Sequence, residues 1–343
     1  MNKRILMNLA GLTAALTVTT VQAVPQIPEK SGWRGQVNLA AGAGTSESNM
    51  IDGIASIDLG QEKISSLDEG PDSEEFFLPG LQFELAYTLG ENRTQFYLGN
   101  LVADYTSFEL QTSLRTHLGI RQEIPGITVL DISLSRSSLP LDVWKDPYIV
   151  DAKRGDTERT ANGLHMAFDR ILGTRLELKW SSSEIEIDDE RSGEALGLSR
   201  AEQNSLRREG QVYNVKLLYD WTINEQHRLK PTIGWVDRDL DGGAMAEDGM
   251  AYALQYLYER NRWLFVSQVF YEDLESDTRN PIYNKQGSVD KIGAVFTAFY
   301  TRPFGLEHWT ANATVGYQDN DSNIDFYDST FGLISFGMLY RFD

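Results

Sequence analysis

Strict alternation of apolar and polar side chains is the feature of this sequence that most limits its fold. It is clearest over residues 108–121, where the even positions are apolar or threonine and the odd positions are polar, charged or glycine. An amphipathic helix repeats its apolar stripe every 3.6 residues, so a period of two indicates a strand with one apolar and one polar face.

The same alternation recurs along the chain and predicts about fourteen strands. They cover residues 33–43, 81–89, 93–101, 108–121, 127–136, 160–170, 174–187, 213–223, 227–238, 252–258, 262–272, 292–300, 309–317 and 334–342. Strands near 9–11 residues, joined alternately by short and long links, are typical of outer-membrane barrels, whereas sandwich strands are shorter. We therefore predict an all-β fold, a closed antiparallel transmembrane β-barrel of about 14 strands with short periplasmic turns and long acidic extracellular loops.

The first residues have the layout of a secretory signal peptide. Lys3 and Arg4 precede an apolar run that ends near Val21, and Ala23 offers a small residue for cleavage. We expect a signal peptide over 1–23, a short periplasmic lead over 24–32 and one barrel domain over 33–343, placed in a Gram-negative outer membrane after cleavage near Ala23. The chain has no cysteine, which excludes a disulfide scaffold and a thiolate metal site.

Several segments resemble those of an uncharacterised protein family. They read IPEKSG (27–32), ISSL (64–67), PDS (71–73), VWKDPY (143–148), IDDERSG (187–193), NPIY (280–283) and DSNIDFYD (321–328). The chain is similar in them to a domain-of-unknown-function family of Gram-negative outer-membrane β-barrel proteins. The resemblance implies the barrel fold and its location, and it brings neither an activity nor site residues.

The last segment alternates to the end of the chain. Its even positions are apolar from Ile334 to Phe342, and Asp343 follows. This resembles the terminal strand that the barrel-assembly machinery reads in outer-membrane proteins. The expected partners are therefore that machinery together with outer-membrane lipid and lipopolysaccharide.

The acidic charge is concentrated in the predicted external loops. The chain carries 31 basic and 50 acidic residues, a net charge of −19, which disfavours nucleic acid as a partner. The loops cover residues 45–75, 102–106, 137–158, 188–210, 239–248, 273–290 and 319–328, and together they hold 33 acidic and 10 basic residues. We expect them to discourage anions that approach from outside.

Charges on the polar faces of the strands are expected to point into the lumen, because each would cost roughly 2–4 kcal/mol against lipid at mid-bilayer. The predicted pore-lining residues are Arg34, Glu84, Glu109, Arg115, His117, Arg121, Asp131, His165, Glu177, Lys179, Lys216, Arg228, Lys230 and Lys291. Barrels of about eight strands are filled by side chains and those of 16–18 hold a channel, so fourteen favours a narrow pore over a filled lumen.

The loop at 137–159 is unusually apolar for an external segment. Its predicted constriction residues are Leu139, Leu141, Val143, Trp144, Pro147 and Tyr148. So apolar a loop favours packing over exposure to solvent, and we expect it to fold against the barrel mouth or into the lumen.

Motifs for metal binding and catalysis are weak. Asp237–Gly242 with Asp248 follows the D-x-D-x-D-G pattern of calcium loops, but an acidic loop on a strand hairpin is favoured, and no metal or cofactor is predicted. No hydrolase elbow, zinc helix or P-loop occurs, and His117 and His165 are expected to be hydrogen-bonding groups of the lumen.

The predicted function is a porin-like channel for passive passage of small polar solutes. The alternatives are a closed-lumen structural or surface-interaction barrel whose acidic loops contact cations or lipopolysaccharide, and a carrier of hydrophobic molecules, which a lateral gap in the wall would favour. A barrel enzyme is a minor alternative, because catalytic partners can be distant in sequence.

Overall fold

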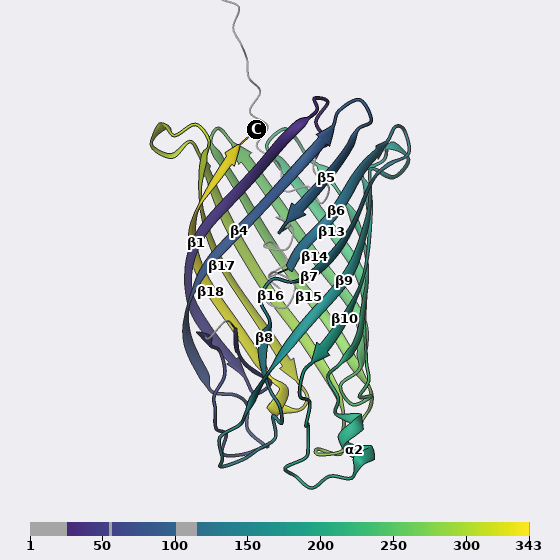
Figure 1. The fold of residues 1–343 in the computed structure, drawn as a ribbon, viewed down its shortest axis with the longest axis vertical. Coiled ribbons are helices and arrows are strands. Elements are labelled where there is room, and N and C mark those ends of the chain that lie inside the picture. The colour runs from purple at the N-terminus through teal and green to yellow at the C-terminus, as the bar shows by residue number, and fades with distance from the viewer. Residues whose placement is uncertain (1–25, 55–56, 101–114, 343) are drawn as a thin grey trace, which may run out of the picture.

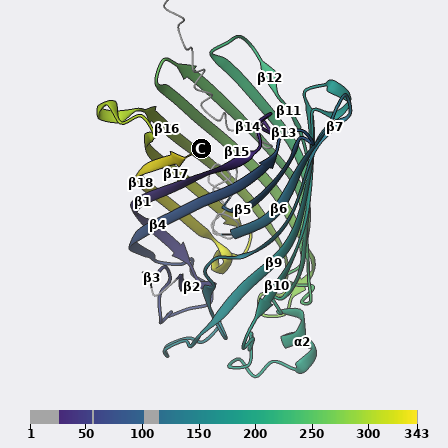
Figure 2. The same ribbon diagram turned by 45° about the horizontal axis from the view of Figure 1, so that its top comes forward.

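The computed structural model describes residues 26–54, 57–100 and 115–342, and in these residues fourteen antiparallel wall strands form a closed barrel (Figures 1 and 2). β1 (Gly32–Ser48) is hydrogen-bonded on one edge to β4 (Ser73–Leu89) and on the other to β18 (Ser329–Phe342), so the first and last strands meet. The predicted transmembrane barrel and its strand number are confirmed.

The other wall strands follow in chain order around the ring. They are β5 (Thr94–Gly99), β6 (Arg115–Ile124), β7 (Thr128–Ser137), β9 (Asp156–Asp169), β10 (Leu176–Ile187), β11 (Gly210–Tyr219) with its continuation β12 (Trp221–Thr222), β13 (His227–Leu240), β14 (Glu247–Arg260), β15 (Trp263–Asn280), β16 (Lys285–Thr301) and β17 (Trp309–Ser322). The predicted signal peptide at 1–23, the link at 102–106, the strand residues 108–114 and Glu109 lie outside the described residues.

Several strands are longer than the sequence predicted. The expected loop at 273–290 is mostly a hairpin, because β15 ends at Asn280 and β16 begins at Lys285. The ladder continues there through pairs such as Glu275 with Ser288, and the Gln286 side-chain amide donates to the Ser276 carbonyl at 2.6 Å. The barrel therefore continues beyond the bilayer on the side opposite the start of β1 and the end of β18 (Figure 1).

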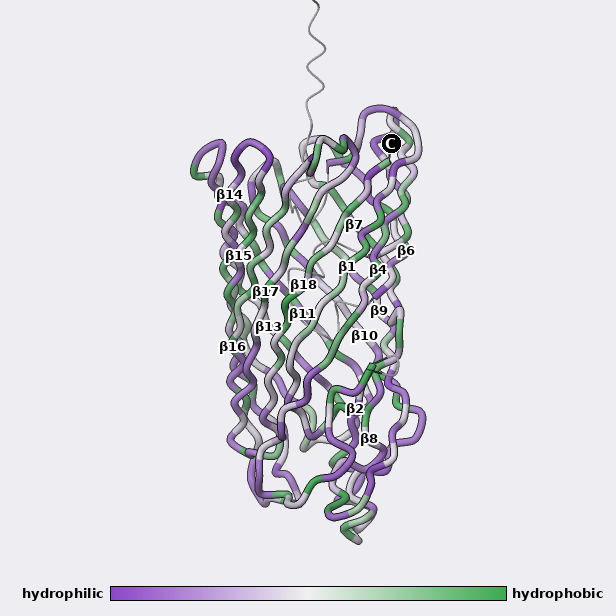
Figure 3. The backbone as a smooth tube through the Cα atoms, turned by 90° about the vertical axis from the view of Figure 1, so that its left-hand side faces the viewer, coloured by the Kyte–Doolittle hydropathy of each residue, from purple (hydrophilic) through white to green (hydrophobic). Residues whose placement is uncertain are grey.

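The outward face of the wall is apolar between two aromatic zones. Leu118 and Leu134 are each 62% exposed at the middle of the wall. On β15, Trp263 and Tyr271 mark the two zones, and eight residues at 3.3 Å on a strand tilted by about 40° span roughly 20 Å of membrane. Figure 3 shows the alternation along the strands and the hydrophilic end that carries the long connections.

A small sheet covers part of the external mouth. β2 (Ile51–Ile54) pairs with β3 (Ile57–Asp58) and with β8 (Leu141–Trp144), and β8 pairs with the wall strand β9. These segments share an apolar cluster whose buried members are Ile54, Leu59, Phe76, Leu141, Val143 and Ile187. We call the structure formed here and by the packed loops beside it the cap.

A second apolar cluster packs loops from distant parts of the sequence together in the cap. Tyr148 and Phe326 are fully buried and pack with residues of the 206, 244 and 324 regions. The Tyr148 and Tyr327 hydroxyls are 2.7 Å apart, and the Asn280 side-chain amide donates to the Tyr327 hydroxyl at 2.7 Å. These contacts join loops that are far apart in the chain.

The helices of the described segments are short. α2 (Arg200–Ser205) starts with a capping box, in which the Ser199 side chain accepts from the Glu202 amide and the Glu202 carboxylate accepts from the Ser199 amide. None of them is long and apolar enough to cross a membrane.

Phe336→Arg tests the lipid-facing surface. Phe336 is 67% exposed in the middle of β18, between Ala41 and Ala313 on the neighbouring strands. An arginine there should lower the free energy of unfolding from lipid vesicles by roughly 2–4 kcal/mol, measured by urea titration. Phe336→Leu is the control, and an arginine variant as stable as the leucine variant would contradict the assignment.

Tyr327→Phe tests the hydrogen bonds of the cap. The change removes the shared partner of Tyr148 and Asn280 and should cost about 1–3 kcal/mol of local stability. Faster amide exchange at 144–148 and 324–328 is the expected readout. Tyr283→Phe is a matched control, because the described residues give its buried hydroxyl no partner; equal exchange in both variants would refute the role of Tyr327.

Asp52→Asn tests the acidic side of the cap. Partial burial, and after it the carboxylates of Asp156 and Asp142, raise the pKa of Asp52 from 3.8 to about 6. The folded state therefore favours the protonated form of Asp52. The stability that this protonated carboxyl group contributes is lost as pH rises through about 6. The variant should exceed the wild type in stability at pH 7.5 and match it at pH 3.5. Asp151→Asn in the adjacent loop is the control, and a pH-independent difference would disprove the assignment.

Candidate functional site

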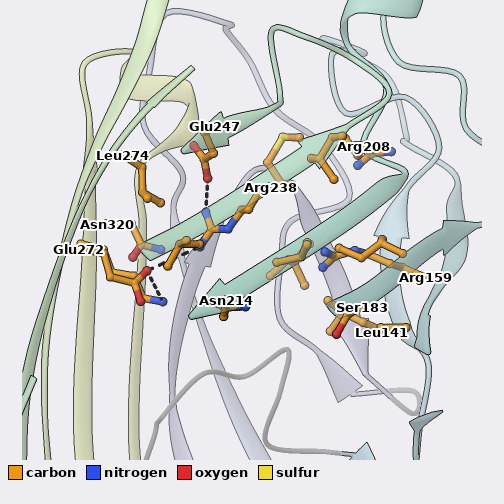
Figure 4. Close-up of a pocket in the computed structure, with 18 of the residues that line it drawn as sticks. Leu141, Arg159, Ser183, Arg208, Asn214, Arg238, Glu247, Glu272, Leu274 and Asn320 are labelled. Atoms are coloured by element: carbon orange, nitrogen blue, oxygen red, sulfur yellow. Dashed lines mark hydrogen bonds and ion pairs between the residues drawn. The ribbon is translucent and has the colours of Figure 1, made fainter. Parts of the chain in front are cut away.

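A cavity of about 560 Å³ lies inside the external part of the barrel, under the cap. Its wall is built by inward-facing residues of β1, β6, β7, β9, β10, β11 and β13 to β18, together with β2 and β8 from the cap. Its volume falls in the range of small-molecule sites. We take this cavity as the candidate functional site (Figure 4).

Cationic side chains outnumber carboxylates on the cavity wall. The lining cations are Arg115, Arg159, Lys179, Arg208, Lys216, Arg238 and Lys291, and the lining carboxylates are Glu47, Asp131, Glu247 and Glu272. The balance is opposite in sign to that of the whole chain, whose net charge is −19.

One side of the cavity holds an alternating network of charges. Arg238 on β13 pairs with Glu247 across the β13–β14 hairpin, and its other terminal nitrogen lies 3.7 Å from Glu272 on β15. Glu272 in turn meets Lys291 on β16 at 3.5 Å. Figure 4 shows Arg238 between the two glutamates. These four charges compensate one another within the wall.

Two more arginines are fixed by neighbours. Arg208 forms a bidentate pair with Glu190, with a contact of 2.9 Å, and donates to the Trp144 carbonyl at 2.6 Å. Arg115 on β6 reaches across two strands and donates to the Ser183 hydroxyl on β10 at 2.8 Å. Both side chains are buried, so they are held rigidly at the cavity wall.

Arg159 on β9 differs from the other arginines. Within the described chain, no hydrogen bond or ion pair engages its guanidinium, which is partly buried and lines the cavity. The charges that act most strongly on it are those of Arg208, Arg238 and Arg115, all of the same sign. A carboxylate of opposite sign, Glu190, is already paired with Arg208.

The immediate neighbours of Arg159 are apolar. Its cross-strand partners are Leu141 on β8 and Ile187 on β10, and directly opposed residues of antiparallel strands share one face. Both belong to the first cap cluster. The cavity therefore sets a cationic group directly beside an apolar surface.

The predicted pore-lining residues of the periplasmic half form a separate network. Arg121 contacts Asp131 at 3.1 Å and Glu84 at 3.2 Å, and it stacks on the Tyr97 ring at 3.8 Å. Arg34 shares the Gln95 side-chain oxygen with Arg121. The side chains face inward, and among them only Asp131 lines the cavity.

The remaining predicted pore residues fall into two groups. Lys179, which lines the cavity, lies 3.5 Å from Glu177, and Lys216 lines the cavity on β11. Arg228 and Lys230 on β13 both face Asp220, at 3.8 and 3.6 Å, away from the cavity.

The predicted constriction residues separate along their segment. Leu139, Leu141 and Val143 line the cavity, although Leu139 is 43% exposed. Trp144, Pro147 and Tyr148 are buried inside the cap and do not reach the cavity. The first three form part of its ceiling.

The two histidines of the wall have serine partners that the sequence did not reveal. Ser135 and the His165 Nε2 are 2.8 Å apart, and Ser133 and the His117 Nδ1 are 3.2 Å apart. A histidine next to a serine can act as the base that activates the serine as a nucleophile in a hydrolase. Within residues 26–54, 57–100 and 115–342, these hydrogen bonds join the two rings to serines, and neither of them is to a carboxylate.

The calcium-like motif folds as a hairpin. Asp237 and Asp239 lie in β13, and Asp248 stands opposite Asp237 on β14. Across residues 26–54, 57–100 and 115–342, no group of three or more His, Asp or Glu side chains is placed to hold a metal ion.

Sequence reasoning missed the arginines that matter most in the cavity. Arg159 and Arg208 lay in segments predicted as external loops, whereas Arg159 belongs to β9 and Arg208 faces the cavity from just before β11. Arg238 could have been predicted from the sequence. It is an even-numbered residue of the same strand as Arg228 and Lys230, so the alternation places all three side chains on the inward face.

Solved structures with a similar barrel show low sequence identity. An OmpT loop-deletion mutant, an outer membrane protein of Vibrio cholerae, is 8% identical, covers 91% of this chain and 99% of its own, and has a TM-score of 0.42. The outer membrane channel DcaP of Acinetobacter baumannii is 10% identical, with 91% and 97% covered and a TM-score of 0.41. A Pseudomonas aeruginosa FadL homologue is 10% identical, with 91% and 90% covered and a TM-score of 0.41.

Curated proteins offer no match. The family model described as "Protein of unknown function (DUF2860)" matches residues 32–341, which is nearly the whole barrel. The chain belongs to this family of proteins of unknown function.

Proposed function

We propose that the protein is a porin-like channel that lets small polar solutes cross the outer membrane. The observation that carries the proposal is the hollow of about 560 Å³ lined by charged side chains within a closed wall. A barrel that served only as a scaffold would fill its interior with paired side chains, as barrels of about eight strands do. Opposed charges along a polar conduit orient and select the solutes that pass.

The cap supports a narrow entry rather than a wide one. β8 lies over the cavity and is hydrogen-bonded on both edges, to β2 and to β9. Its side chains Leu141 and Val143 belong both to the cavity lining and to the first cap cluster. Passage would therefore be limited to small solutes and would depend on the position of this sheet over the cavity.

A closed structural barrel is the competing function, because the cap packs over the same mouth. The two functions differ in ion conductance. The purified full chain in a planar bilayer should give discrete conductance steps if it is a channel. A protein that inserts but never conducts would overturn the proposal.

Deletion of residues 141–150 tests the cap as the constriction. The change removes β8 and Tyr148, so the unitary conductance should rise. Deletion of residues 200–204 in α2, none of which lines the cavity, is the control and should leave the conductance unchanged. Equal conductance of the 141–150 deletion and the wild type would reject the constriction.

A further inference from the structure

Among the described residues, no counter-charge forms an ion pair with the guanidinium of Arg159. A buried or half-buried cation is costly unless a counter-charge or hydrogen-bond acceptors meet it. Arg208 has Glu190, and Arg238 has Glu247 and Glu272, but Arg159 has no such partner in the described chain. The charged side chains that act most strongly on it are Arg208, Arg238 and Arg115, which are of the same sign, with Glu190 opposing them.

The free guanidinium faces the open volume of the cavity. Arg159 is a lining residue, and Figure 4 draws it with Arg208 on one side, across from Glu272, Leu274 and Asn320. A planar guanidinium presents paired N–H donors that match the two oxygens of a carboxylate. An anion entering the cavity would therefore find a preformed partner.

The surroundings of Arg159 also select for an apolar portion on that anion. Leu141 and Ile187 flank it on the two neighbouring strands, and Ile54 and Val143 of the same cluster also line the cavity. A small inorganic anion would leave this surface in contact with water. A ligand with a ring or short chain would cover it and be stabilised by removing this apolar surface from water.

We propose that the cavity is a binding site for small organic anions, with the carboxylate held by Arg159 and the apolar body placed against Leu141 and Ile187. This inference, which rests on the proposed channel function, names the class of solute that the channel takes. The acidic partners of Arg208 and Arg238 keep those two side chains in place, so Arg159 makes the direct contact.

Equilibrium binding to the full-length protein in an uncharged detergent tests the site. Benzoate is the probe, benzamide has the same shape without charge, and acetate has the charge without the ring. Calorimetry should show benzoate binding about tenfold or more tighter than either, because a charge-assisted hydrogen bond and an apolar contact are each lost in one control. No heat with benzoate, or equal affinity for benzamide or acetate, would overturn the proposal.

Variants assign the contact to the residue. Arg159→Gln should weaken benzoate binding about tenfold or more, while Arg200→Gln, the same change on the exposed surface of α2, should leave it unchanged. If Arg159→Gln does not fold, Leu141→Ala should weaken benzoate binding and leave acetate binding as it was. Benzoate affinity equal to wild type in the Arg159 variant, or in the Leu141 variant, would refute the placement.

The anion site and the channel are tested by separate measurements, so one can be disproved without the other. The calorimetric test requires a folded barrel in detergent but no passage through it. Conductance without benzoate binding would leave the channel and remove the anion site. Benzoate binding that depends on Arg159, without conductance, would remove the channel and leave the site as a receptor for the same anions.

Discussion

The requirement that every backbone donor and acceptor be paired in lipid determines the rest of this structure. Hydrocarbon offers no hydrogen bonds, so a sheet can span it only if no edge is left open. The pairing of β1 with both β4 and β18 meets this condition where the first and last strands of the barrel meet. Once the ring is closed, each inward side chain faces one shared interior.

The separation of charge follows from that ring. Acidic side chains collect in the external connections, whereas the cavity wall carries more cations than carboxylates. At physiological ionic strength, interactions between exposed charges are largely screened beyond about 8 Å, while those within the enclosed wall are screened much less. An anion close to Arg159 therefore responds mainly to the wall, even though the chain as a whole is strongly acidic.

The wall was predictable from the sequence because a period of two assigns each residue to one face. A slip of one residue would turn every side chain over, and so Arg115, His117 and Arg121 could be placed inward on β6 from the pattern alone. The convergence at the cavity was not predictable. It depends on which residues of separate strands reach the same height, as where Arg115 meets Ser183 two strands beyond β7, and this is fixed by the register around the whole ring. The ends of the strands were also missed, since pairs such as Glu275 with Ser288 continue the ladder without the apolar alternation.

The cap and the cavity share residues of β8. Leu141 packs in the cap cluster, lines the cavity and stands opposite Arg159 in the β8–β9 ladder. A ligand that binds only when these two residues are in place stabilises the packed cap by mass action, because any movement of β8 breaks its apolar contact. Conversely, a cap that opens releases the ligand. In the proposed channel this coupling would make the cap responsive to the solute, and it arises because β8, a strand of the cap, is hydrogen-bonded to the wall strand β9.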